Sequence, residues 1–179
     1  APDRDKLPLP ELELDEVQPV VETAARQARA MREEEGGRLA EDLLGRLRLM
    51  EAEVGVVEAA APDRLERERD RIRDAVARLL PDGVPVDEDR VAREIAHLAE
   101  RWDIQEEVVR FRSHLAMFRD TVSRGSDDGV GKRLGFIVQE ILREVNTMGS
   151  KANDATIARA VVSLKEEIER IREQVENVE

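Results

Sequence analysis

Apolar residues recur at steps of three and four along most of this chain, which is the spacing that an amphipathic helix requires. Over residues 11–60 the pattern runs from Val17 to Val57 and predicts one long helix. Gly36 and Gly37 lie inside it. Each glycine costs roughly 1 kcal/mol relative to alanine in a helix, so this pair marks the weakest point of the predicted element.

Shorter helices are predicted for the middle of the chain. One is expected to begin near Pro62 and to end at the PDGVP sequence of residues 81–85, which forces a turn. Asp87 is placed to cap the next helix. The apolar stripe of that helix changes phase between Trp102 and Ile104.

Two helices are predicted for the C-terminal part. A glycine-rich polar loop at residues 124–131 precedes a helix over residues 132–147, and a short break at residues 148–153 follows. Asp154 can cap the last helix, in which apolar residues alternate steps of four and three for three heptads from Ile157 onward. We expect this stripe to pack against the long first helix; the alternative is a coiled-coil contact between subunits.

Together these elements predict an all-α fold, an elongated antiparallel helical bundle with long N-terminal and C-terminal helices. Residues 1–10 contain three prolines among charged residues and predict a linker from a missing N-terminal domain. Residues 11–86 are expected to form a long helical hairpin arm. Residues 87–179 are expected to form a C-terminal helical domain.

Composition agrees with a helical bundle and restricts the function. Leu, Ile and Val supply nearly all of the apolar core, because the 179 residues include three Phe, one Trp and no Tyr. The formal charge of −12 repels RNA on average, so a nucleic-acid contact requires a local basic patch. The chain has no cysteine, no apolar run near the ~20 residues of a membrane span and no secretory signal pattern. We therefore expect a cytoplasmic protein without a membrane partner.

Two rows of polar residues at helical spacing would form a site if they faced each other. Residues on one face of the third predicted helix are Asp103, Glu107, Arg110 and His114. The next helix offers Arg133, Glu140, Arg143 and Glu144, with Ser150 and Lys151 beyond them. Carboxylates can hold Mn²⁺ or Mg²⁺, an imidazole can bind metal or move a proton, and Arg and Lys can hold phosphate. In so charged a chain the same spacing is also typical of solvated salt bridges.

Three segments carry a more specific pattern. Residues 99–118 read AERWDIQEEVVRFRSHLAMF, residues 131–179 read GKRLGFIVQEILREVNTMGSKANDATIARAVVSLKEEIERIREQVENVE, and residues 32–47 read REEEGGRLAEDLLGRL. They resemble the YicC/YloC family, whose C-terminal signature contains R-x-D-I-x-E-E, S-H-L, G-R-x-L-D-F-x-x-Q-E, N-R-E-x-N-T, S-K and a terminal R-E-Q-x-Q-N-x-E, and which has an R-E-x-E-G-x-x-L segment nearer its start. The likeness spans most of the chain.

The resemblance implies a metal-dependent endoribonuclease in the bacterial cytoplasm, assembled as a hexameric ring, with RNA rather than DNA as its partner. The residues that match its motif positions are Asp103, Glu106, Glu107, His114, Lys132, Arg133, Gln139, Glu140, Arg143, Glu144, Asn146, Ser150 and Lys151. We assign catalysis to Glu107, His114, Glu140 and Glu144. Metal binding, with Mn²⁺ or Mg²⁺ as the ion, is assigned to the same four residues and Asp103. RNA binding is assigned to Lys132, Arg133, Arg143, Asn146, Ser150 and Lys151.

The chain departs from the family pattern at three positions. Gly135 stands where the family usually has Asp, Leu142 where it has Asn, and Glu176 where it has Gln. If the Asp or the Asn that the family has at positions 135 and 142 binds metal or RNA, activity would be altered or absent in this chain. The alternative function is a non-catalytic helical scaffold that mediates assembly while a partner processes the RNA.

Overall fold

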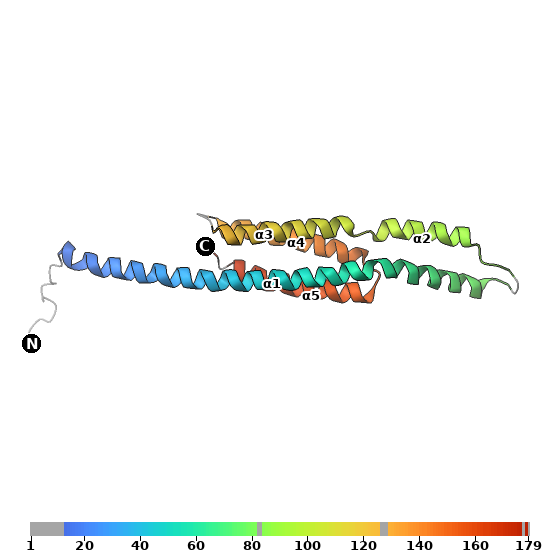
Figure 1. The fold of residues 1–179 in the computed structure, drawn as a ribbon, viewed down its shortest axis with the longest axis horizontal. Coiled ribbons are helices and arrows are strands. Elements are labelled where there is room, and N and C mark those ends of the chain that lie inside the picture. The colour runs from blue at the N-terminus through green and yellow to red at the C-terminus, as the bar shows by residue number, and fades with distance from the viewer. Residues whose placement is uncertain (1–12, 82–83, 126–128, 177, 179) are drawn as a thin grey trace, which may run out of the picture. The chain divides into compact units, whose positions relative to one another are not determined.

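The computed structural model describes residues 13–81, 84–125, 129–176 and 178. These residues form five helices and no strand, so the all-α prediction is confirmed (Figure 1). The helices are α1 (Leu14–Leu79), α2 (Glu88–Trp102), α3 (Gln105–Arg124), α4 (Val130–Lys151) and α5 (Ala155–Val175). The linker predicted for residues 1–10 lies outside the described residues. No helix in the described ranges is long and apolar enough to cross a membrane.

The chain divides into two compact units, Ala1–Glu41 and Asp42–Glu179. In the first unit, the described residues 14–41 belong to α1, and none of their side chains is buried. Several apolar residues of this part are open to solvent, among them Leu14 and Met31, which are 78% and 71% exposed. The hydrophobic core therefore belongs to the second unit.

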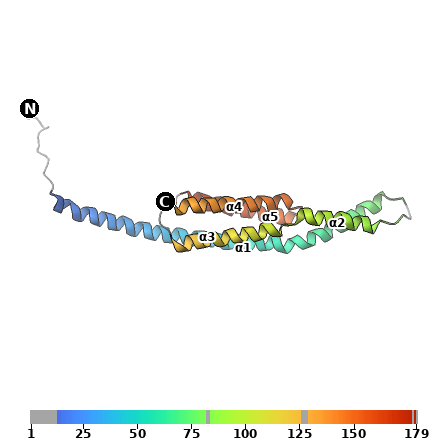
Figure 2. The ribbon, with the colours of Figure 1, turned by 90° about the horizontal axis from the view of Figure 1, so that it is seen from above.

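The second unit is a four-helix bundle made of α1 from Asp42 onward, α3, α4 and α5 (Figure 2). Each helix buries an apolar stripe in the shared core, as the helical spacing predicts. Fully buried representatives, one or two from each helix, are Leu47, Met50, Phe111, Ile141 and Leu164. The predicted heptads of the last helix thus pack within the chain.

Ion pairs between helices establish that α1 runs antiparallel to both of its neighbours. Glu51 pairs with Arg119 and Glu58 with Arg112, so higher numbers in α1 meet lower numbers in α3. The same holds for α5, because Arg46 pairs with Glu167 at 3.0 Å while Arg67 pairs with Asp154. The predicted antiparallel bundle with long terminal helices is confirmed.

The helix α1 continues through two places where the sequence favours a break. Gly36 and Gly37 do not interrupt it, as predicted, but Pro62 does not begin a new helix either, so the separate helix predicted from Pro62 is wrong. An internal proline costs about 3 kcal/mol because it removes a backbone hydrogen bond. Val57 and Arg64, on either side of Pro62, are both buried in the bundle, and this packing holds the helix together across the proline.

The third predicted helix is in fact two. It ends at Trp102 and restarts at Gln105, where the apolar stripe changes phase. The Asp103 carboxylate accepts a hydrogen bond from the Gln105 N–H at 2.9 Å, which stabilises the start of α3. The cap predicted at Asp87 is confirmed, since its carboxylate accepts from the Arg90 N–H at 3.0 Å.

The helix α4 is longer than the residues 132–147 that the sequence predicts. It runs to Lys151, and Met148 inside the added turn is fully buried. The predicted break shrinks to residues 152–154. The cap predicted at Asp154 is confirmed, because its carboxylate accepts from the N–H groups of Thr156 and Ile157 at 2.8 and 3.1 Å.

Candidate functional site

Lys151, at the last residue of α4, joins that helix to the start of α3. Its ammonium Nζ donates to the backbone oxygen of Asp103 at 2.8 Å and to Oε1 of Glu107 at 2.9 Å. Glu107 is only 6% exposed, and its second oxygen, Oε2, is buried without a hydrogen-bond partner among the described atoms. The structure therefore pairs a predicted catalytic carboxylate with a predicted RNA-binding cation, and both charges are largely neutralised by each other.

Arg64 contacts the same helix ends, and the sequence analysis did not predict it. Arg64, Trp102, Asp103, Glu107 and Lys151 are together called the junction. Its guanidinium donates to the backbone oxygens of Trp102 and Lys151, which end α2 and α4, and it lies 5.7 Å from the centroid of the Trp102 ring. Burial lowers the pKa of Arg64, while the negative charges of Asp154 and Asp103 oppose that shift. A guanidinium nevertheless stays charged in proteins. One signal for it existed: Arg64 follows the buried Val57 by seven residues, a spacing that returns to the same helix face.

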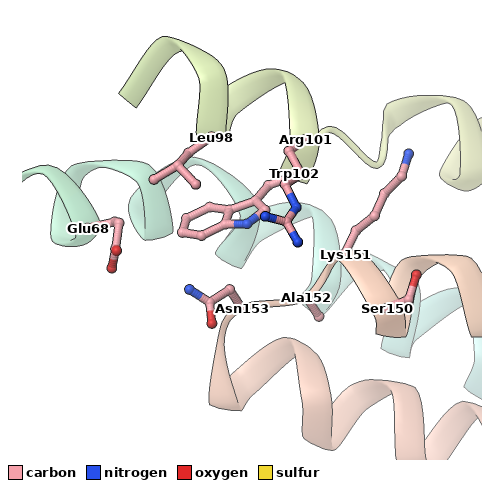
Figure 3. A pocket seen from close by; sticks show the side chains of 8 residues that line it. All are labelled: Glu68, Leu98, Arg101, Trp102, Ser150, Lys151, Ala152 and Asn153. Atoms are coloured by element: carbon pink, nitrogen blue, oxygen red, sulfur yellow. The ribbon is translucent and has the colours of Figure 1, made fainter. Parts of the chain in front are cut away.

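A pocket of about 530 Å³ opens beside the junction (Figure 3). Arg101 and Trp102 reach into it from the end of α2, and Asn153 lies across from them in the link between α4 and α5. The remaining lining residues are Glu68, Leu98, Ser150, Lys151 and Ala152. The hydrogen bond from Arg71 lowers the pKa of Glu68, so this wall of the pocket is an ion-paired carboxylate.

The register between α3 and α4 brings two more predicted residues to one level. The helices are antiparallel, and the contact between Lys151 and Glu107 sets their register. Seven residues further along α3 is the half-buried His114, and seven residues back along α4 is Glu144, which is 4% exposed. A seven-residue step returns each helix to the same face, so these two side chains lie level along the seam between the helices.

The predicted metal ligands do not form a complete metal site within one chain. No group of three or more His, Asp or Glu side chains among the described residues is arranged to hold an ion. Glu107 is engaged by Lys151, and the Asp103 carboxylate accepts a hydrogen bond from the Gln105 N–H. Metal binding stays a prediction.

The solvent-facing side of α4 has an unusual composition for so acidic a chain. Its exposed residues, defined here as the α4 face, are Lys132, Arg133, Phe136, Gln139, Arg143, Asn146 and Ser150. None is acidic, although the chain carries 41 Asp and Glu and a net charge of −12. The two acids of α4 are withdrawn, since Glu144 is buried and the Glu140 side chain is 29% exposed. By contrast, α3 exposes Glu106 and Asp120, and α5 exposes Glu166, Glu169 and Glu173.

The α4 face contains five of the six predicted RNA-binding residues. They are spread along the length of the helix, and we call this row of residues the track. Lys132 and Ser150 are eighteen residues apart, which is about 27 Å at the rise of an α-helix. Neither Lys132 nor Arg133 has an ion-pair or side-chain hydrogen-bond partner within the described ranges. Arg143 approaches Glu140 at 3.9 Å and its side chain is 74% exposed. The cations of this track are therefore available to an anion.

Residues 57–179 match the family model described as endoribonuclease YicC-like, C-terminal. Over 159 residues the chain is 40% identical to a protein of Clostridioides difficile strain 630 named "Probable endoribonuclease YicC". It is 35% identical over 150 residues to a Haemophilus influenzae protein of the same name.

These alignments cover 89% and 84% of this chain but 54% and 50% of the two relatives. The chain therefore spans about half the length of the curated relatives that it matches. The matched region includes all of α2 to α5, and with them every residue of the junction and of the α4 face.

Proposed function

Because the chain belongs to the YicC-like endoribonuclease family, we propose that the protein containing it binds RNA along the α4 face and cleaves its phosphodiester bonds. The observation that carries the proposal is the absence of carboxylates from the described exposed residues of α4. A polyanion is repelled by an average surface of this chain, whose net charge is −12. Along α4, RNA meets three exposed cations, Lys132, Arg133 and Arg143, and no fully exposed carboxylate.

Phosphate contacts supply most of the affinity in RNA binding that does not depend on sequence. Lys132, Arg133 and Arg143 are suited to these contacts, and Asn146 and Ser150 can donate hydrogen bonds to phosphate or ribose oxygens. We assign Lys151 a different role from the one predicted. Its ammonium is engaged by Glu107 and the Asp103 carbonyl, so it positions the start of α3 against the end of α4.

His114 is the residue we propose for proton transfer during cleavage. It is half-buried on the side of α3 that carries Glu107, and no other described residue pairs with its imidazole. Imidazole is the side chain best suited to exchange a proton near neutral pH. On α4, the Glu140 side chain is 29% exposed and is the carboxylate that a substrate or an ion can reach, whereas Glu144 is buried.

The same proposal includes three further properties: dependence on a divalent ion, assembly into a hexamer and action in cytoplasmic RNA turnover. Their support is the resemblance of the motifs to those of the family. An oligomer would provide ligands from a second subunit. A divalent ion, when bound, supplies positive charge that stabilises the phosphate oxygens during cleavage.

The test uses the full-length protein and a short single-stranded RNA. The double variant Lys132→Gln, Arg143→Gln removes two proposed phosphate contacts, and each contact contributes about 0.7 to the slope of log affinity against log salt. We expect the magnitude of that slope to fall by about 1.4. The matched control is Arg159→Gln, Lys165→Gln, which removes two exposed cations from α5 and should leave the slope unchanged. Equal effects of the two variants would show that only net charge matters.

Cleavage is measured on the same RNA with Mn²⁺, Mg²⁺ or EDTA. The His114→Ala variant should lose cleavage by about a hundredfold or more while it keeps its affinity for RNA and its helicity. Wild-type protein that binds and assembles but cuts no RNA under any of these conditions would favour the scaffold function instead.

A further inference from the structure

Phe136 is an exposed aromatic residue in a chain that has few. The other two phenylalanines, Phe111 and Phe118, are fully buried, whereas Phe136 is 63% exposed on α4. An isolated apolar side chain at a surface is common and needs no explanation by itself. What distinguishes Phe136 is the group of residues around it.

The fully exposed neighbours of Phe136 on the α4 face are basic or neutral. Lys132 precedes it by four residues, Gln139 follows by three, and Arg143 by seven, spacings that place all of them on one side of the helix. Arg133, three residues before it, is exposed as well. On its own helix the ring therefore has three cations and an amide near it, together with Glu140, four residues on, whose side chain is 29% exposed and lies 3.9 Å from Arg143.

We propose that Phe136 is a stacking platform for an unpaired base of RNA, an inference that rests on the RNA-binding function proposed above. A nucleobase is planar and apolar on its faces, so it can cover the exposed ring while its flanking phosphates reach Lys132, Arg133 and Arg143. Aromatic platforms beside a basic track are the recurring solution for single-stranded nucleic acid, because every base has a π-face. The bases of a duplex are already stacked, so the platform selects single-stranded segments.

A second copy of this chain is a poorer occupant of the same surface. A twofold contact through the α4 face would bring together two copies of a surface that carries Lys132, Arg133 and Arg143. Such like charges repel each other across an interface. An RNA strand fits this surface better, because its phosphates are attracted to the cations and its flat bases can stack on the Phe136 ring.

The experiment compares two RNA strands of equal length and charge, one with all bases and one abasic along its backbone, bound to the full-length protein. Fluorescence anisotropy gives the dissociation constants. We expect Phe136→Ala to weaken binding of the base-bearing strand by about five- to a hundredfold and to leave binding of the abasic strand unchanged. Phe136→Tyr keeps a ring and should bind as the wild type does, whereas Phe136→Leu keeps the apolar character without the ring and should behave like Phe136→Ala.

The matched control is Val162→Ala, which shortens another exposed apolar side chain, 57% exposed on α5, and should change neither affinity. The inference is overturned if Phe136→Ala weakens both strands equally, or neither. A change of sedimentation state in Phe136→Ala, without a base-dependent loss of affinity, would instead assign the residue to a contact between copies. If the wild-type protein binds neither strand, the proposed RNA-binding function is wrong. This outcome can be distinguished from failure of the Phe136 inference alone, in which the wild-type protein still binds RNA.

Discussion

Two glycines of α4 show how strongly the effect of a substitution depends on the atoms around it. A Cβ atom built on Gly131 would overlap the backbone oxygen of Val178, so the glycine allows the chain end to approach α4 closely. Nothing lies within 4 Å of a Cβ atom on Gly135, the position where the family usually has Asp. Both glycines have negative φ angles, so the difference between them comes from packing and not from backbone conformation.

From this contrast we predict opposite effects of the same substitution. Gly135→Ala should raise the free energy of unfolding by about 0.5–1 kcal/mol, because alanine loses less conformational entropy in a helix. Gly131→Ala should lower it by about 1 kcal/mol or more, since the Val178 backbone must move. Urea unfolding followed by circular dichroism measures both values. Stabilisation by both variants would contradict the close approach at Gly131.

Among the elements, the two helix ends at the junction depend on one buried guanidinium. Arg64 of α1 is 5% exposed and contacts the backbone oxygens of Trp102 and Lys151, which are terminal carbonyls of α2 and α4. Terminal carbonyls have no partner within their own helix. Arg64 therefore supplies, from a third helix, the hydrogen bonds that these two helix ends lack.

We predict that Arg64→Met lowers the free energy of unfolding by about 1–3 kcal/mol, because it leaves those buried oxygens without donors. Hydrogen exchange should speed up at the end of α2 and the start of α3 more than within α5. The control Arg71→Met removes an exposed arginine of the same helix, whose side chain is 70% exposed and pairs with Glu68, and should cost no more than about 0.5 kcal/mol. Equal costs for the two variants would contradict the role given to Arg64.

For the whole molecule, the relevant fact is how unevenly the core is distributed. The buried apolar residues of the described chain run from Leu43 to Val175 and all lie in the second compact unit. The helical residues 14–41 of the first unit bury no side chain. Burial of apolar surface is the main source of folding free energy, so the second unit should carry nearly all of the stability.

We therefore predict that a chain starting at Asp42 unfolds cooperatively at a midpoint within about 4 °C of that of the 179-residue chain. The helical signal of circular dichroism should decrease by the helical content of the removed residues. Differential scanning calorimetry checks the midpoint. A large fall in the midpoint would show that residues 1–41 stabilise the bundle.

Much of the local structure could be predicted because its causes lie within a few residues. Asp87 and Asp154 cap helices through hydrogen bonds to N–H groups two or three positions ahead. The phase change of the apolar stripe marked the place where α2 ends and α3 begins. The placement of Asp103, Glu107 and His114 on one side of their segment also followed from helical spacing.

Other features could not be predicted, because they depend on contacts between segments distant in sequence. Pro62 favours a helix start locally, but buried neighbours on both sides keep α1 continuous. Lys151 matched a phosphate-binding role by charge, yet it pairs with Glu107, forty-four residues away. Its partner depends on how far α4 extends, and the sequence-based helix ended four residues short of it.

The sequence by itself determined that this protein is helical, where most of its helices begin, which side of each helix is apolar and which family its motifs resemble. These properties follow from the period of the helix and from short-range hydrogen bonds. Only the tertiary structure decided which charges are available, because the register between antiparallel helices pairs Lys151 with Glu107, buries Glu144 and leaves the α4 face without an exposed carboxylate. A charge that is paired between helices, such as that of Lys151, is held within its own chain, whereas an exposed charge can contact a partner molecule.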